Sequence, residues 1–162
     1  MEKFQELNEL AKKKIRISDH MLTQTYPLIK DPKMLLSILE NVFLALTNAF
    51  SSVIYYERMY KRVPLFQDNF ESKFDIFKTR VVKKYNIDKR YVELIRDVKE
   101  IIIQHRKSPI EFQRKDSLVI CNESYHMKTV SVNTIKEFIE KSKDFILIVD
   151  NILKKERKIM SV

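Results

Sequence analysis

The stretch PKMLLSILENVFLALTNAFSSVIYYERMYKR, residues 32–62, decides the fold of this chain. Its apolar residues recur at helical spacing and form two stripes along one helix. One stripe contains Leu35, Leu39, Val42, Leu46, Ala49, Val53, Tyr56 and Tyr60, and the other contains Leu36, Phe43 and Phe50. Because a helix that is apolar on two faces packs against neighbours on two sides, we expect this one to be the central helix of a bundle.

Four further helices are expected around this central one. The same periodicity predicts a first helix over residues 2–26, and the Asp31-Pro32 pair caps and begins the central helix. A capping box at residues 68–71, DNFE, opens a third helix. A fourth helix has its apolar face over residues 91–105, and the last helix starts near Ser131 or Asn133.

The periodicity changes between the fourth and the last helix. The sequence Ser108-Pro109-Ile110-Glu111 has the pattern of a helix start and predicts a short helical turn over residues 112–114. Residues 118–121 and 125–130 no longer follow the helical period and are expected to be two strands, and Asn122 between them tolerates φ > 0 in place of glycine. We therefore expect one β-hairpin here.

The sequence contains no glycine, whereas about eleven would be average for this length. The glycine-rich loops of Walker-type ATPases and Rossmann dehydrogenases and the nucleophile elbow of α/β-hydrolases are therefore excluded. Small β-barrels are disfavoured because they need many tight turns. We expect residues 1–162 to form one all-α domain, an up-down bundle of about five helices with a small β-hairpin before the last helix.

The chain is basic, with 31 Lys and Arg against 22 Asp and Glu and a formal net charge of +9. Such a balance favours a polyanion or an acidic partner. The same count also fits a soluble protein with a lysine-rich surface. Charge alone leaves these two interpretations open.

Cysteine use and the hydropathy pattern indicate a cytoplasmic protein. Cys121 is the single cysteine and cannot form an intrachain disulfide, which fits a reducing compartment. The N-terminal residues 1–14 are amphipathic and lack the apolar core of a signal peptide. The most apolar stretch, residues 41–56, is shorter than the ~20 residues of a membrane span. We expect no membrane partner.

The three histidines, His20, His105 and His126, lie outside the spacings of common metal sites. Glu123 and His126 match one Glu-x-x-His element of di-iron bundles, but such sites need a second pair on facing helices. Asp19 lies next to His20, but no nucleophile is paired with them. We therefore predict no metal and no cofactor.

A cluster of ionisable residues surrounds the break after the fourth helix. Here Arg106 is a candidate phosphate clamp, His105 a candidate proton donor or acceptor, and Glu111 a candidate base. These three residues are the candidate catalytic set. An arginine close to a carboxylate also fits a structural ion pair, which leaves a purely structural interpretation open.

The order of the expected helices, with this cluster after the fourth one, resembles that of the HEPN superfamily of helical-bundle proteins. In that family an Arg-x(4–6)-His motif follows the fourth helix, and ribonuclease members use it across a dimer interface to cut RNA without metal. Arg106 stands where the arginine of the motif would fall, whereas the histidine positions hold Glu111, Phe112 and Gln113. The resemblance implies a homodimeric bundle that keeps the arginine of the motif and lacks its histidine.

Basic residues gather in the middle of the chain and suggest a nucleic-acid surface. The candidate contacts are Lys73, Arg80, Lys83, Lys84, Lys89, Arg90, Arg106, Lys107 and Arg114. Tyr85 and Tyr91 lie among them and offer rings that can stack on unpaired bases. The alternative is that the tyrosines cap the core and the lysines only solvate an outer helix face.

Three functions follow from these observations. The first is a non-catalytic, HEPN-like module that binds RNA or nucleotides through a basic helical surface. The second is a divergent metal-independent ribonuclease that uses His105, Arg106 and Glu111. The third, which the resemblance implies, is a helical protein-interaction partner of a nucleotidyltransferase.

Overall fold

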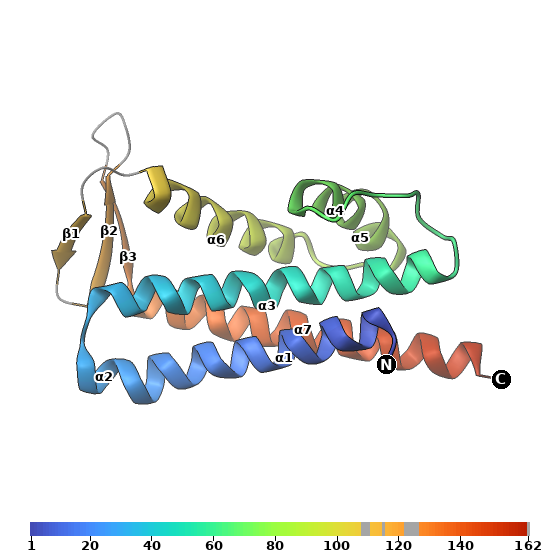
Figure 1. The fold of residues 1–162 in the computed structure, drawn as a ribbon, viewed down its shortest axis with the longest axis horizontal. Helices are drawn as coiled ribbons and strands as arrows, with labels where there is room; N and C mark the ends of the chain where they lie inside the picture. The colour runs from blue at the N-terminus through green and yellow to red at the C-terminus, as the bar shows by residue number, and fades with distance from the viewer. Residues whose placement is uncertain (108–110, 115, 122–126, 162) are drawn as a thin grey trace.

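The computed structural model describes residues 1–107, 111–114, 116–121 and 127–161 (Figure 1). Its helices and strands follow the order expected of a bundle with a small sheet before the last helix. The elements are α1 Lys3–His20, η1 Met21–Thr25, α2 Tyr26–Ile29, α3 Pro32–Met59, α4 Phe70–Ile76, η2 Phe77–Val81, α5 Val82–Lys84, α6 Lys89–Lys107, β1 Glu111–Arg114, β2 Ser117–Cys121, β3 Met127–Ser131 and α7 Val132–Met160.

α3 lies at the centre of an up-down bundle (Figure 1). α1 and α7 pack on one side of it, and α6 and the α4–η2–α5 segment pack on the other. The segments α1–η1–α2 and α4–η2–α5 are each one continuous rod, so the described residues form five rods. The all-α bundle of about five helices is therefore confirmed.

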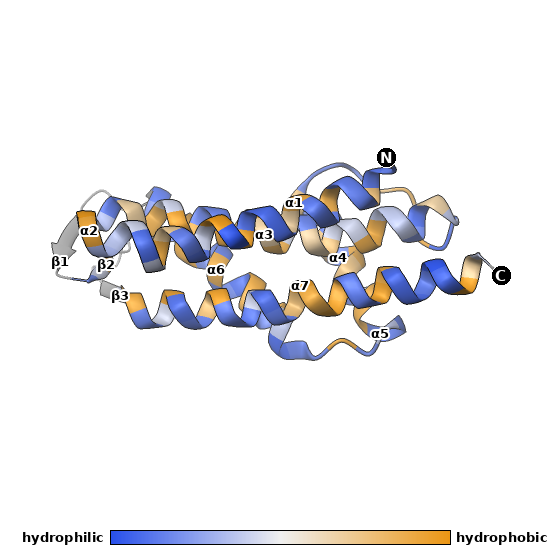
Figure 2. Ribbon diagram, turned by 90° about the horizontal axis from the view of Figure 1, so that it is seen from below, coloured by the Kyte–Doolittle hydropathy of each residue, from blue (hydrophilic) through white to orange (hydrophobic). Residues whose placement is uncertain are grey.

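Burial of apolar side chains on α3 explains why the other helices surround it. Leu35, Leu39, Val42 and Leu46 are fully buried, as their stripe predicts. Phe50 stacks on Phe77 of η2 with ring centroids 5.2 Å apart, which joins α3 to the α4–α5 rod. The outer helices α1 and α7 alternate hydrophilic and hydrophobic residues along their length, as amphipathic helices do (Figure 2).

α3 is also long and apolar enough to cross a membrane, judged by length and composition alone. Core helices of soluble proteins pass the same test. In this structure, fourteen residues of α3 are buried against the rest of the chain, so its apolar surface is used in packing.

Helix starts are capped by short polar side chains, mostly as the sequence predicts. The Asp31 carboxylate accepts from the amide of Lys33 at 3.0 Å, and Ser131 Oγ accepts from the amide of Thr134 at 3.1 Å. The third helix differs by one residue from the expected capping box. Its cap is Asn69, because Asp68 instead pairs with Lys73 at 3.0 Å.

Two helices contain a π-helical turn that the sequence analysis did not predict. Both turns lie over an Asp-x-x-x-Thr sequence, and the threonine hydroxyl donates to the aspartate carbonyl four residues earlier. The distances are 2.7 Å for Thr23 and 2.8 Å for Thr79. The first rod continues to Ile29, past the expected end at residue 26, and Pro27 lies just after its π-helical turn.

The β-hairpin is confirmed, and a third strand joins it. β2 pairs antiparallel with β3, with Leu118 opposite Val130. β1 pairs antiparallel with the other edge of β2, with Phe112 opposite Val119, so the short helical turn expected over residues 112–114 is wrong. Pairing with a central strand overrides the local helix-start signal. The expected tip at Asn122 lies outside the described residues.

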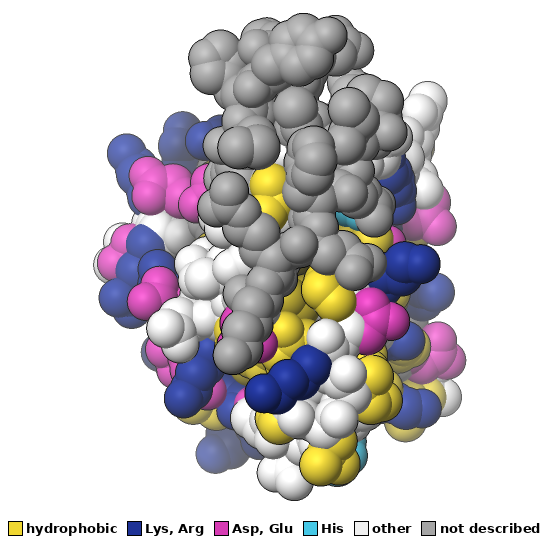
Figure 3. Space-filling model, turned by 90° about the vertical axis from the view of Figure 1, so that its left-hand side faces the viewer, with side chains coloured by type: hydrophobic (Ala, Val, Ile, Leu, Met, Phe, Trp, Pro, Cys, Tyr) yellow, Lys and Arg dark blue, Asp and Glu magenta, His cyan; other side chains and the backbone are white. Residues whose placement is uncertain are grey.

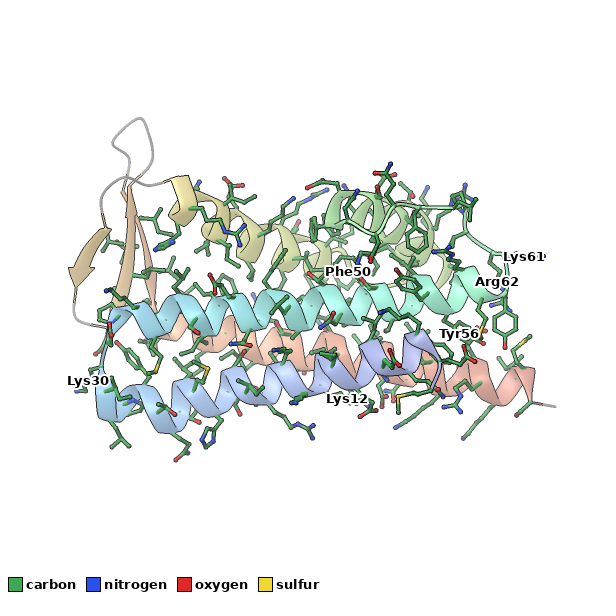
Figure 4. All side chains as sticks on the ribbon, in the orientation of Figure 1. Lys12, Lys30, Phe50, Tyr56, Lys61 and Arg62 are labelled. Carbon is green, nitrogen blue, oxygen red and sulfur yellow. The ribbon has the colours of Figure 1, made fainter. Side chains whose placement is uncertain are left out.

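A buried polar cluster joins the two outer helices α1 and α7. Asp150 of α7 accepts a hydrogen bond from Asn8 at 2.9 Å and pairs with Lys12 and Lys154, each at 2.8 Å. Lys12 extends from α1 (Figure 4). Burial alone would raise the pKa of the Asp150 carboxyl, but these three partners outweigh it and lower the pKa from 3.8 to about 2.

The lowered pKa of Asp150 predicts that the protein loses stability in acid, and that Asp150→Asn removes this part of the loss. A carboxyl with a lower pKa in the folded state stabilises the fold fully above about pH 4 and loses this effect as the pH falls to about 2. The expected contribution is about 2 kcal/mol. Urea unfolding between about pH 6 and pH 2 should show a steeper loss of stability in the wild type than in Asp150→Asn. Equal pH dependence in both proteins would contradict the assignment.

Candidate anion-binding site

The structure divides the predicted nucleic-acid contacts into two groups at opposite ends of α6. One group, from Lys73 to Arg90, lies on α4–η2–α5 and the start of α6, and the other begins at Arg106. Lys89 and Arg106 are 17 helical residues apart, which corresponds to about 26 Å. The two groups therefore do not form one continuous surface.

The Arg106 group lies where α6 meets the sheet. Arg106 is exposed, and His105 is half-buried. The side chains of Lys107, Glu111 and Arg114 lie outside what the structure describes, so a contact between Arg106 and Glu111 stays a prediction. Seen from this end, Lys and Arg side chains alternate with Asp and Glu side chains along both flanks (Figure 3). The described cations at this end do not gather into one patch.

Within the first group, three of the predicted contacts already have partners in the chain. Lys73 pairs with Asp68, Lys84 pairs with Glu57, and Arg90 donates to the hydroxyl of Tyr91 at 3.0 Å. Arg90 also lies 3.8 Å from Asp88. These partners hold the cations in defined positions.

The other three, Arg80, Lys83 and Lys89, are exposed and make no ion pair with any described residue. They lie close together in sequence, on η2, α5 and the start of α6. Residues 78–90 carry six cations and a single acid, Asp88. We call the exposed cations of this segment, Arg80, Lys83, Lys84, Lys89 and Arg90, the elbow surface.

A buried glutamate, Glu57, lies under one edge of the elbow surface. It is the only acid between residues 41 and 67, and its side chain is 2% exposed. Lys84 Nζ donates to both carboxylate oxygens, at 3.0 Å to Oε1 and 2.8 Å to Oε2. The Tyr85 hydroxyl donates to Oε1, and Arg62 Nη1 lies 3.5 Å from the same oxygen. Glu57 thus ties the end of α3 to α5.

The C-terminus of α3 explains how Arg62 reaches Glu57. Lys61 takes a left-handed conformation with φ 56°, and the amide of Arg62 donates to the carbonyl of Glu57 at 2.9 Å. The amide of Lys61 donates to the carbonyl of Arg58, also at 2.9 Å, which completes a Schellman motif. Lys61 and Arg62 lie where α3 ends (Figure 4). Arg62 also reaches Glu156 of α7 at 3.4 Å.

These residues line a cavity of about 210 Å³ between the end of α3 and η2–α5. Its lining is formed by Glu57, Arg62, Val63, Arg80, Val81 and Lys84. Three cations therefore face one carboxylate. Burial and the hydrogen bond to Glu57 both raise the pKa of the Tyr85 hydroxyl, so Tyr85 stays protonated and acts as a donor.

The basic pattern of the sequence points to Arg80 and Lys84 as ligand contacts but not to Glu57 and Arg62. The available signal was the position of Glu57, seven residues after Phe50 and four after Val53, which places it on the buried side of α3. A charged residue at such a position needs partners of opposite charge. No comparable sequence signal predicts the left-handed conformation of Lys61. Such helix ends are usually recognised by a glycine, and this position holds a lysine.

Comparison with known protein families, with curated proteins and with solved structures finds no match for this chain. The resemblance to the HEPN superfamily, and the homodimer and ribonuclease chemistry that it implies, therefore stay predictions. Among the described residues, no three His, Cys, Asp or Glu side chains gather as a metal site would require. Glu123 and His126 lie outside those residues.

The left-handed Lys61 predicts that Lys61→Gly stabilises the protein. A left-handed residue with a Cβ costs about 1–2 kcal/mol, and the greater flexibility of unfolded glycine offsets part of that gain. The free energy of unfolding in urea should therefore rise by about 0.5 kcal/mol. Lys13→Gly, in the middle of α1, is the control and should lower it by about 1 kcal/mol. A loss of stability in Lys61→Gly would contradict this account of the joint.

Proposed function

We propose that this chain binds RNA without cleaving it, through contacts between the elbow surface and the phosphate backbone. The observation that supports this most is the cluster of exposed cations Arg80, Lys83 and Lys89, which have no ion pair among the described residues. Mobile, unpaired cations can exchange bound counterions for phosphates when a nucleic acid binds. The net charge of +9 adds long-range attraction to any polyanion.

The tyrosines of this segment have a smaller role than the sequence suggests. Tyr91 is 2% exposed and packs on Phe145 with ring centroids 5.4 Å apart, and the half-buried Tyr85 holds Glu57 through its hydroxyl. Neither ring is free to stack on a base in this arrangement. Binding should therefore depend on phosphates and show little preference for sequence.

Neutralising the elbow surface should abolish most of the affinity. In fluorescence anisotropy with labelled single-stranded RNA, three phosphate contacts, one each for Arg80, Lys83 and Lys89, predict a fall in affinity of about 20-fold between 50 and 200 mM salt. The triple variant Arg80→Gln, Lys83→Gln, Lys89→Gln should bind weakly, with a shallower salt dependence. The matched control is Lys13→Gln, Arg16→Gln, Lys136→Gln, which removes the same charge from exposed positions on α1 and α7. An equal loss of RNA affinity in both triple variants would contradict binding through the elbow surface.

The same RNA should stay intact. The position of the motif histidine is occupied by Glu111, Phe112 or Gln113, none of which replaces imidazole as a general acid and base near pH 7. Incubation of end-labelled RNA with the protein in EDTA, followed by electrophoresis, measures this directly. Cleavage by the wild type that disappears in Arg106→Ala would overturn the non-catalytic assignment and favour a ribonuclease that uses Arg106.

A further inference from the structure

We infer that the cavity beside Glu57 is a subsite for a phosphomonoester, the phosphate group that carries a single ester bond at the end of an RNA strand. This inference rests on the proposed function for the origin of the phosphate. The cavity itself can be tested with inorganic phosphate alone. Its cations are Arg62, Arg80 and Lys84.

The three cations surround the cavity from two separate segments of the chain. Arg62 comes from the turn after α3, whereas Arg80 and Lys84 lie four residues apart on η2–α5. The π-helical turn includes Arg80 and Val81, and both line the cavity. The apolar walls Val63 and Val81 lower the local dielectric, which strengthens the attraction between cations and an entering anion.

Two of these cations are held in place before any ligand enters. Lys84 is fixed by both oxygens of Glu57, and Arg62 is held between Glu57 and Glu156. Arg80 makes no ion pair with a described residue, so its guanidinium is available for a bidentate contact with phosphate oxygens. A site with two fixed cations and one available arginine orders few groups when it binds.

The carboxylate of Glu57 selects which phosphate can enter. A carboxylate only accepts hydrogen bonds, and Glu57 Oε2 receives one from Lys84 and none from any other described residue. A phosphomonoester has a second pKa of about 6, so near neutral pH it can carry a proton and donate it to this oxygen. Backbone phosphodiesters and sulfate carry no such proton, so they cannot donate a hydrogen bond to the Glu57 carboxylate. The site therefore favours a strand end over the backbone.

The alternative is that these charges form only a structural ion-pair cluster that joins α3 to α5. Such a cluster binds no anion selectively. The two interpretations differ in their response to phosphate and sulfate, since a general attraction to positive charge treats the two anions alike.

Isothermal titration of the full-length chain with inorganic phosphate and with sulfate tests the subsite. We expect phosphate to bind about tenfold more tightly than sulfate, the effect of one charge-assisted hydrogen bond. Arg80→Gln should weaken phosphate binding by about tenfold, and Arg16→Gln, at an exposed position of α1 outside the elbow surface, should leave it unchanged. Phosphate binding equal to sulfate binding, or a loss as large in Arg16→Gln as in Arg80→Gln, would overturn the subsite.

Glu57→Gln tests the selectivity separately. An amide can donate as well as accept, so the preference for phosphate over sulfate should fall to about one while sulfate binds more tightly. Circular dichroism checks that this variant is folded. If it is not, the Arg80→Gln titration still decides, because Arg80 makes no ion pair with any residue that the structure describes. A folded Glu57→Gln that keeps the full preference would overturn the role of the carboxylate.

RNA oligonucleotides that differ only at their ends separate this inference from the proposed function. Three versions of one strand carry a 5′-phosphate, a 3′-phosphate or hydroxyls at both ends. We expect at least one of the two phosphorylated strands to bind more tightly than the strand with hydroxyls at both ends. We expect added inorganic phosphate to remove this difference in affinity. Equal binding of all three strands would overturn the subsite and leave RNA binding standing. Selective phosphate binding without RNA binding would support the cavity and overturn the proposed function.

Discussion

The structure depends on the burial of α3. Its side chains are apolar on several faces, and residues outside the two predicted stripes, such as Ile38, Ala45 and Ile54, are fully buried as well. Each large apolar side chain that leaves water stabilises the fold by about 1.5–3 kcal/mol. A helix of this kind is stable only when neighbours cover its apolar faces, and α1, α7, α6 and the α4–α5 rod do so.

The ion pairs of Glu57 also follow from the burial of α3. Because the glutamate lies on the buried surface of α3, its carboxylate must be paired, and Lys84, Arg62 and Tyr85 provide the partners. Pairing brings cations from two segments to one place. Arg80 adds a further positive charge at the edge of the cavity, so the requirement to neutralise a buried acid leaves a small site with an excess of positive charge.

The absence of glycine shapes the joints between helices. Four of the described residues take left-handed conformations, namely Lys30, Lys61, Asn86 and Asp116. Asparagine and aspartate adopt this conformation readily, whereas lysine does so at a cost. At Lys61 the surrounding structure maintains the conformation, because the Schellman bonds and the ion pairs of Arg62 fix the turn. The absent glycines therefore exclude backbone phosphate loops but still allow sharp helix ends.

Sequence periodicity determined the helices, because a stripe of apolar residues at helical spacing can be buried in only one way. The change of period also indicated the hairpin, and the Asp31-Pro32 pattern indicated the cap of α3, whereas the choice of Ser131 over Asn133 as the cap of α7 comes from the structure. Only the tertiary structure decided that β1 is a strand, that Arg106 lies about 26 Å from Lys89 along α6, and that Glu57 meets Lys84. These features depend on pairing between segments that are distant in sequence, and local propensity carries no information about such pairing.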